Sequence, residues 1–161
     1  MVVFRVHSLD RVDKLILERL LEDGRASFSQ LARETKLTDV AIKKRVERLQ
    51  RKGILKSVTA QLDYASLGYQ KPVFLHLRVD PSMNADVRKK LQSMDHVVEL
   101  YETMGEFNLL VKVVSPSMEL VHRFLQDLGR LGGVKEVTSH LVLSEVKRSA
   151  SLPTPSLQKR L

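Results

Sequence analysis

The residues with the most distinctive chemistry form a dense run of cations in the first third of the chain. Between residues 42 and 52, six basic side chains face a single acid, Glu47: Lys43, Lys44, Arg45, Arg48, Arg51 and Lys52. In the same stretch Ile42, Val46 and Leu49 recur at i, i+4 and i+7, which predicts a helix with one apolar stripe. A helix held by its stripe and positive elsewhere suits a DNA major groove. The alternative is a basic face that is merely solvated.

The elements predicted around this helix favour DNA binding over a solvated face. Thr38 is a good N-cap for the basic helix, and Asp39 then lies in its first turn. Ser27 followed by Gln30 forms a capping box, which marks the start of a second helix just upstream. A further helix begins at Asp10, and Gly24 is a natural stop after it.

Two short strands are expected after the basic helix, at Ile54–Lys56 and Val58–Leu62. Three helices followed by such a pair make a winged helix-turn-helix. We expect its DNA contacts to come from the start and the basic face of the third helix, with Arg48 and Arg51 as phosphate partners. The predicted DNA-binding residues are Thr38, Asp39, Lys43, Lys44, Arg45, Arg48 and Arg51.

Charge and composition agree with a DNA-binding front domain. Residues 1–63 carry 14 Lys and Arg against 9 Asp and Glu, whereas residues 64–146 carry 9 against 10. The chain has no cysteine, which excludes disulfides and cysteine-rich zinc sites. No apolar run is long enough for a membrane span, and the N-terminus lacks the pattern of a signal peptide. We therefore expect a cytoplasmic protein with no membrane association.

The second half of the chain alternates twice between strand and helix patterns. Strands are predicted at residues 73–79, 97–103, 107–114 and 134–146, with helices opening at Pro81 and near Ser117. The order βαββαβ indicates an α+β domain of the split βαβ, ferredoxin-like kind. The expected domains are 1–63 (DNA-binding, with a short N-terminal arm), 64–72 (linker), 73–148 (ferredoxin-like) and 149–161 (flexible basic tail).

The outward face of this sheet is not polar enough for a surface in water. Phe74, Leu110, Val114 and Val142 are expected there, together with Lys112 and His76. A large exposed apolar patch usually marks an interface. We infer a homodimer that packs sheet against sheet, which would supply two DNA-binding domains for a two-fold symmetric site. The alternative is that the linker or the N-terminal arm covers the face.

Several segments, in order along the chain, resemble the Lrp/AsnC (feast/famine) family of transcriptional regulators. They are LDRVDKLILERLLEDGR at 9–25, LARETKLTDVAIKKRVERLQRKGIL at 31–55, SLG at 66–68, MGEFN at 104–108 and GGVKEVTSHLVLSEVK at 132–147. The resemblance covers roughly residues 9–153. It implies an N-terminal winged helix on promoter DNA, and a βαββαβ domain that dimerises, assembles into rings such as octamers, and senses an amino acid.

The resemblance also implies an effector site between dimers, around a turn usually written Gly-x-Tyr-Asp. Here Phe107 and Asn108 replace the tyrosine and the aspartate, and Val137 and Ser139 replace a Thr-x-Thr pair of the last strand. Losing the aspartate while keeping amides and hydroxyls favours a neutral polar effector such as glutamine. The expected effector residues are Glu102, Thr103, Met104, Gly105, Glu106, Phe107, Asn108, His122, Gln126, Val137, Thr138, Ser139 and His140.

Other chemistry has little support in the sequence. The five histidines show no metal-ligand spacing, and no phosphate loop, nucleophile elbow or pair of catalytic carboxylates is present, so we expect neither an enzyme nor a bound cofactor. The βαββαβ order also occurs in RNA-binding modules, but FNLLVKVV at 107–114 lacks their stacking aromatics. Two alternatives stay open: an effector-independent architectural DNA-binding protein, and a regulator tuned by a partner protein.

Overall fold

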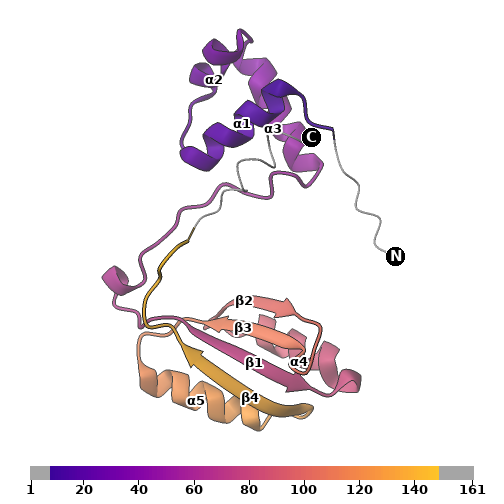
Figure 1. Ribbon diagram of the computed structural model, residues 1–161, viewed down its shortest axis with the longest axis vertical. Helices are drawn as coiled ribbons and strands as arrows, with labels where there is room; N and C mark the ends of the chain where they lie inside the picture. Colours follow the sequence, from indigo (N-terminus) through magenta and orange to yellow (C-terminus); the bar gives the residue numbers. More distant parts are fainter. Residues whose placement is uncertain (1–7, 149–161) are drawn as a thin grey trace. The chain divides into compact units, whose positions relative to one another are not determined.

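A computed structural model describes residues 8–148 of the chain, which form two compact units. The N-terminal unit holds the described residues up to Gln61 together with residues 147–148, and the C-terminal unit spans Leu62–Val146 (Figure 1). The predicted arm and the predicted tail, at residues 1–7 and 149–161, lie outside the described residues. Within the described part, no helix is both long enough and apolar enough to cross a membrane.

The N-terminal unit is built from three helices: α1 (Arg11–Glu22), α2 (Phe28–Thr35) and α3 (Asp39–Arg51). Each begins where a capping side chain accepts a hydrogen bond from the first turn. Asp10 accepts from Asp13 N, Ser27 from Gln30 N and Thr38 from Ala41 N. These bonds satisfy backbone N–H groups that a helix start leaves without partners, so the predicted starts are confirmed.

The apolar stripe of α3 faces the core of this unit, as predicted. Ile42 is 0 % exposed, Leu49 1 % and Val46 8 %. They pack with Ile16 of α1 and Leu31 of α2. Because three positions one turn apart are buried, the rotation of α3 about its axis is set and its basic side turns to solvent.

The predicted wing is not formed, because residues 52–61 contain no strand. Ile54 N and Leu55 N both donate to Leu49 O and so close the end of α3. Only Ser57 would then connect the two expected strands, and the tightest common hairpin loop has two residues. Val58 instead lies against Gly24. The N-terminal unit is therefore a helix-turn-helix without a wing.

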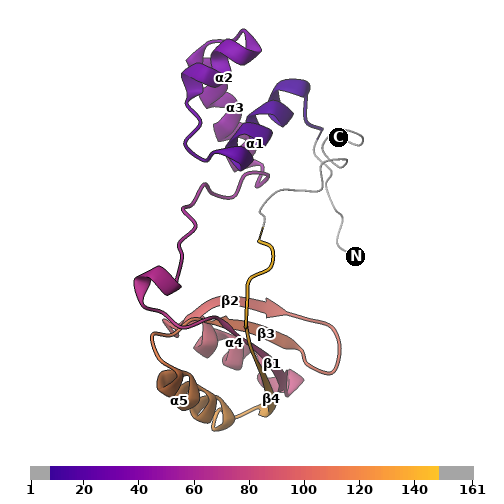
Figure 2. The same cartoon turned by 60° about the vertical axis from the view of Figure 1, so that its left-hand side comes forward.

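The C-terminal unit has the predicted βαββαβ order. After the short helix η1 (Ala65–Leu67) come β1 (Val73–Val79), η2 (Pro81–Met83), α4 (Asn84–Gln92), β2 (Val97–Glu102), β3 (Leu109–Val113), α5 (Met118–Gly129) and β4 (Val134–Leu141). The strands form one antiparallel sheet in the order β2-β3-β1-β4, and both long helices cover the same face (Figure 2). The ferredoxin-like fold is thus confirmed.

The last strand is shorter than predicted, because it ends at Leu141 instead of Val146. Val142 N donates to Pro72 O, 3.0 Å away, where the chain enters β1. Proline has no N–H to return a bond, and a strand continues only while its neighbour offers both groups. The apolar pattern of residues 142–146 alone could not reveal that the partner strand stops.

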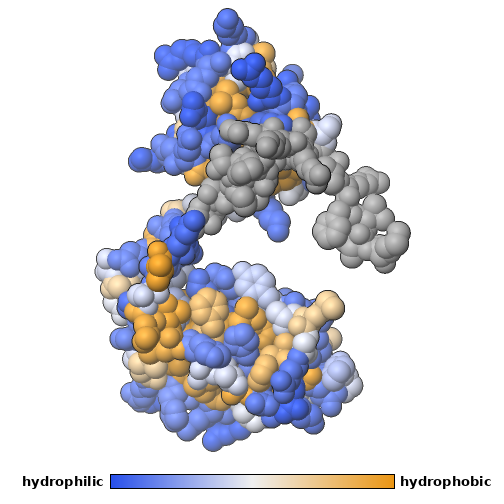
Figure 3. All heavy atoms as spheres, in the orientation of Figure 1, coloured by the Kyte–Doolittle hydropathy of each residue, from blue (hydrophilic) through white to orange (hydrophobic). Residues whose placement is uncertain are grey.

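Alternating side chains of β1 divide the sheet into a core face and an outward face. The core face carries Val73, Leu75, Leu77 and Val79, all at most 3 % exposed, against α4 and α5. The outward face carries side chains from all four strands, which the register places together: Phe74, His76, Leu110, Lys112, Glu99, Tyr101, Thr138 and His140. Hydrophobic surface gathers over the strands in Figure 3, with hydrophilic side chains between.

Lys112 lies on this outward face but is only 8 % exposed. Its Nζ is 2.7 Å from Glu99 Oε1 and 5.9 Å from the centre of the Phe74 ring. Both neighbours cover the stem of the lysine while its charge is paired. Of the two apolar residues expected beyond the strand ends, Val114 is buried and Val142 half-buried.

Candidate DNA interface and effector site

The solvent side of α3 presents a row of polar and basic side chains on a rigid support. Lys43 and Lys44 are exposed, as are Glu47, Gln50 and Arg51 further along the helix. All are held in place by the buried stripe on the opposite side. A positive row of this kind can contact the phosphates that border a groove.

Arg45 and Arg48 are not part of this free row, because both are paired with aspartates of α1. Arg45 Nη1 lies 2.9 Å from Asp13 Oδ1 and 2.5 Å from Asp10 Oδ2. Arg48 Nη2 lies 2.6 Å from Asp13 Oδ2. The sequence predicted both arginines as DNA contacts; the structure instead gives their guanidinium groups carboxylate partners within the chain.

The cluster of Asp10, Asp13, Arg45 and Arg48 ties the start of α1 to the middle of α3. The Asp13 side chain is only 3 % exposed, so its charge depends on the two guanidinium groups. Burial raises the pKa of Asp10, but the hydrogen bond from Arg45 and that from Asp13 N outweigh it, and the net pKa lies below its usual value. The signal in the sequence was the matched spacing, an Asp pair and an Arg pair each three residues apart. Which helices meet was not readable there.

Thr38 and Asp39, the other predicted contacts, serve the geometry of the turn. Thr38 caps α3, and Asp39 Oδ2 accepts a 2.7 Å hydrogen bond from Ser29 Oγ of α2. This bond links the two helices of the motif. Both residues remain exposed and lie at the end of α3 that enters a groove in helix-turn-helix proteins.

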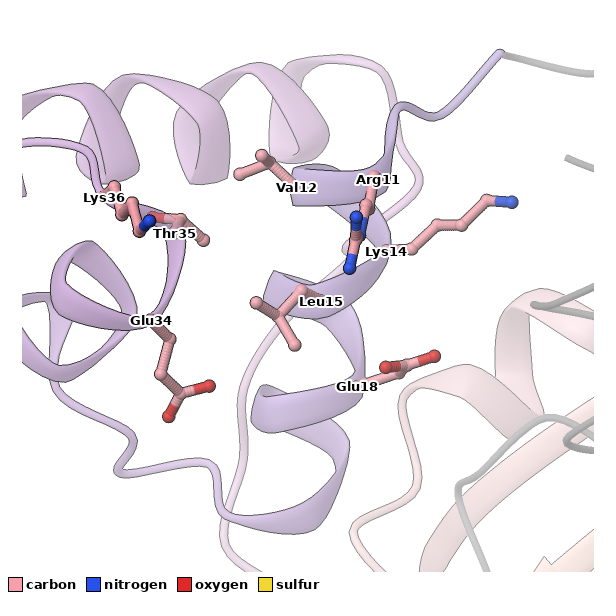
Figure 4. A pocket seen from close by; sticks show the side chains of 8 residues that line it. All are labelled: Arg11, Val12, Lys14, Leu15, Glu18, Glu34, Thr35 and Lys36. Atoms are coloured by element: carbon pink, nitrogen blue, oxygen red, sulfur yellow. The ribbon is translucent and has the colours of Figure 1, made fainter.

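A cavity of about 690 Å³ lies in the N-terminal unit beside α1 and the end of α2 (Figure 4). Val12 and Leu15 project into it from α1, and Glu34 points toward it from α2. Arg19 holds Glu34 at 2.9 Å and so bridges the two helices. Both basic and acidic side chains line the cavity, so its charge does not favour binding of DNA or of another anion.

The turn between β2 and β3 is held by its own hydrogen bonds. Thr103 Oγ1 donates to Phe107 O at 2.8 Å, and Thr103 N donates to Asn108 O at 3.0 Å. Met104 at the tip is fully exposed, and Gly105 has a φ of 130° that a side chain would resist. The backbone of this predicted effector turn is therefore ordered before any ligand arrives.

Asn108 does not point into an open site, because its side chain clamps β3 to β1. Its Oδ1 accepts from Val79 N and its Nδ2 donates to Val79 O, both at 2.8 Å. The side-chain amide of Asn108 thus makes the two hydrogen bonds that the backbone of a neighbouring strand residue would make with Val79. An aspartate could accept from Val79 N but could not donate to the carbonyl. The sequence predicted an effector contact here and missed this structural role.

Changing Asn108 to Asp is expected to destabilise the C-terminal unit by about 1–3 kcal/mol, since a carboxylate would face the Val79 carbonyl. Protonating that carboxyl restores a donor, so part of the lost stability should return as the pH falls through the pKa of the new carboxyl. Urea unfolding followed by tyrosine fluorescence measures the change. Gln126→Glu makes the same amide-to-carboxylate exchange at an exposed site and should move the midpoint little. Equal effects of both variants would contradict the clamp.

The remaining predicted effector residues lie on opposite sides of the C-terminal unit. His122 and Gln126 are exposed on α5, where their side-chain nitrogens lie 3.1 Å apart. His140 and Thr138 lie on the outward face of the sheet, away from the helices. Exposed Ser139 points from β4 to the other face, and Glu106 is exposed in the turn. A pocket that uses both sides cannot close within one copy of the chain.

Three other features of this region were not readable from the sequence. The His76 ring lies 5.2 Å from that of His140 and 6.1 Å from that of Phe107, so it joins the turn to β4. Glu102 is held by Asn84 and Arg88 of α4 at 2.7 and 2.8 Å. Val137 packs against the hydrophobic core. In residues 8–148, no group of three or more histidine, aspartate or glutamate residues is placed to hold a metal ion.

Each of the two units matches a known family of protein domains. The pattern described as the AsnC-type helix-turn-helix domain matches residues 9–50, and that of the Lrp/AsnC ligand binding domain matches residues 72–152. The HTH-type transcriptional regulator FL11 of Pyrococcus horikoshii is 31 % identical over 145 residues, covering 90 % of this chain and 96 % of the relative. Ptr1 of Methanocaldococcus jannaschii is 32 % identical and covers 90 % and 99 %.

Solved structures share the fold over nearly the whole chain. AsnC of E. coli has a TM-score of 0.81 at 24 % identity and covers 91 % of this chain and 100 % of its own. A transcriptional regulator of Neisseria meningitidis, crystallised as a complex with L-Met, has a TM-score of 0.84 at 25 % identity and covers 93 % and 99 %.

Fold, basic helix and relatives together define a transcriptional regulator with a helix-turn-helix domain and a ligand-binding domain, a class of proteins that are not enzymes. Within that class, the chain belongs to the Lrp/AsnC family. The resemblance seen in the sequence is confirmed.

Proposed function

We propose that this protein binds specific DNA sites as a dimer, and that an amino-acid effector bound between copies changes its activity or assembly. The observation that carries the proposal is the solvent-facing basic side of α3, held in place by the buried Ile42, Val46 and Leu49. Residues 1–63 would bind DNA, 64–72 connect, and 73–148 assemble and bind the effector. The protein would work in the cytoplasm, on the genome.

Within the DNA interface, Lys43, Lys44 and Arg51 would contact phosphates and base edges, with Thr38 and Asp39 beside them at the start of α3. Arg45 and Arg48 would act through Asp13 by holding α3 on α1. Lysines are point charges suited to phosphate, so much of the affinity would come from electrostatics and would fall with salt.

Assembly would use the outward face of the sheet. Phe74, Leu110 and the His76 ring are half-buried there although no helix covers them. Packing two such faces together would remove apolar surface from water and place two DNA-binding units in one molecule. Larger rings, such as an octamer, would then bring the α5 face of one dimer against another.

An effector site at such contacts agrees with the distribution of the predicted residues over both sides of the C-terminal unit. Each copy could supply His122 and Gln126 from α5, while another supplies Met104 and Glu106 from its exposed turn. The side chains offered are amide, imidazole, carboxylate and thioether. This set favours a neutral polar amino acid such as glutamine, while the Neisseria relative, whose complex contains L-Met, makes methionine the first competitor to test.

Replacing Lys43 and Lys44 together by alanine is expected to weaken DNA binding and to lower the slope of log affinity against log salt by about 2, since each phosphate contact contributes about 0.9. Fluorescence anisotropy with a duplex selected from a random pool, at several salt concentrations, measures both quantities. Lys89→Ala with Lys90→Ala is the matched control, because these adjacent exposed lysines lie on α4. An unchanged slope in the first variant would remove α3 from the interface. Equal affinity of the protein for selected and random duplexes would favour the architectural alternative.

The effector prediction is tested by calorimetric titration of the full chain with each of the twenty amino acids, with sedimentation run in parallel. Heat and a change of assembly are expected with glutamine or another neutral polar amino acid. Gln126→Ala should reduce the heat of binding, whereas Gln92→Ala, which changes an exposed glutamine at the end of α4, should not. No heat with any amino acid would indicate a regulator that needs no such ligand.

A further inference from the structure

The base-reading groups left on α3 are few, because two of its arginines are already paired. With Arg45 and Arg48 held by aspartates, the exposed side chains of the helix are Val40, Lys43, Lys44, Glu47, Gln50 and Arg51, beside Asp39 at its start. Among the described residues of the N-terminal unit, Val40 has the largest exposed fraction of any large apolar side chain, 63 %.

Val40 is placed where a recognition helix touches bases. It is the second residue of α3 and lies on the same face as Lys43 and Lys44, three and four residues further on. The N-terminal residues of the second helix in a helix-turn-helix are those that reach base edges in the major groove. Lys43 and Lys44 would attract the phosphates of DNA to this face. The binding partner expected next to Val40 is therefore a DNA duplex.

The chemistry of Val40 then limits what it can recognise. Its isopropyl group cannot hydrogen-bond, so it would leave the donors and acceptors of guanine, adenine and cytosine without partners. Thymine alone adds an apolar group to the major groove, the methyl group on C5. We propose that Val40 is a specificity-determining residue that reads a thymine methyl group, an inference that rests on the proposed DNA binding of α3.

The test is thymine-to-uracil scanning of the highest-affinity duplex that the full chain selects from a random pool. Uracil keeps every hydrogen-bonding group of thymine and lacks only the methyl group. At one position in each half-site, uracil is expected to weaken binding about fourfold, the fold-change that corresponds to ~0.8 kcal/mol for one buried methyl group. At the other thymines the effect should be smaller.

A double-mutant cycle assigns the methyl contact to Val40. Val40→Ala should weaken binding to the thymine duplex and should distinguish thymine from uracil at that position less than the native protein does. Val58→Ala removes an exposed valine of the same unit outside α3 and should keep the full discrimination. Far-UV circular dichroism of both variants checks that the helices are intact.

Two results would overturn the inference. In one, Val40→Ala distinguishes thymine from uracil at the same position as strongly as the native protein does; in the other, replacing thymine by uracil weakens binding of the native protein at no position. Neither would touch the proposed DNA binding, which the salt dependence through Lys43 and Lys44 tests separately. If instead no duplex bound in a salt-dependent way, the proposed function itself would fail.

Discussion

Asp13→Ala is expected to destabilise the N-terminal unit by about 2–3 kcal/mol, because it removes charge-assisted hydrogen bonds to Arg45 and Arg48, which stay partly exposed. Here two guanidinium groups lose their shared carboxylate, which is 3 % exposed in the folded chain. The capping box with Asp10 loses one of its two hydrogen bonds as well. Because α3 is held on α1 through this cluster, DNA affinity should fall with the folded fraction.

The chain offers separate optical probes for this measurement. It has no tryptophan, and its three tyrosines, Tyr64, Tyr69 and Tyr101, all belong to the C-terminal unit. Far-UV circular dichroism reports helices of both units, whereas tyrosine fluorescence reports only the C-terminal one. In urea, Asp13→Ala should move the circular dichroism transition to lower concentration and leave the tyrosine transition where it was.

The matched control for this prediction is Glu22→Ala, in the last turn of the same helix. Glu22 also pairs with an arginine, Arg19, but its side chain is 65 % exposed. Exposed ion pairs contribute little, because water and salt screen them. If both variants unfold at the same urea concentration as the native chain, the cluster of Asp10, Asp13, Arg45 and Arg48 does not stabilise the unit. Arg45 and Arg48 would then be candidates for DNA contact, as the sequence predicted.

Gly133→Ala is expected to destabilise the C-terminal unit by about 2–5 kcal/mol, from a strained backbone and a steric clash. Gly133 has a φ of 94°, and a Cβ built on it would lie 2.4 Å from Met83 Cβ. Cβ is the least movable atom of a side chain, so Met83 cannot avoid the clash by changing rotamer. The same turn also supplies the Gly133 carbonyl that accepts from Asp80 N at 2.7 Å.

Gly132→Ala is the control for this prediction, since no heavy atom lies within 4 Å of its Cβ position and its φ is not in the left-handed region. The tyrosine transition in urea should shift strongly for Gly133→Ala and little for Gly132→Ala. Adding Met83→Gly to Gly133→Ala should recover the steric part of the loss only. Equal shifts for the two alanine variants would show that the structure accommodates the Cβ of residue 133 without a loss of stability.

Much of the fold follows from patterns that act over a few residues. Ser27 and Thr38 mark helix starts because a capping side chain bonds a backbone group two or three residues away. The stripe of Ile42, Val46 and Leu49 sets the buried side of α3 for the same reason of spacing. Alternation in residues 73–79 predicts β1 to the residue. The class and family follow from the same ordered segments.

The sequence was least informative where one segment depends on another far away in the chain. The strand pattern of Val58–Leu62 forms no strand because no partner is offered, and β4 stops where Pro72 cannot pair. Arg45 looked free to read bases because nothing near it in sequence binds it. Asn108 looked like an altered ligand contact, and its partner, Val79, lies 29 residues away.

Residue types and their spacing were therefore sufficient for the helices, the βαββαβ order along the chain and the basic face of α3, because caps, stripes and alternation involve near neighbours. The resemblance to the Lrp/AsnC family rested on whole segments of sequence. The pairing of Asp13 with Arg45 and Arg48, the clamp of Asn108 and the division of the effector residues between two sides came from the folded chain. The first two are contacts between residues more than 25 positions apart, and no local pattern encodes which distant partner a charge or an amide will meet.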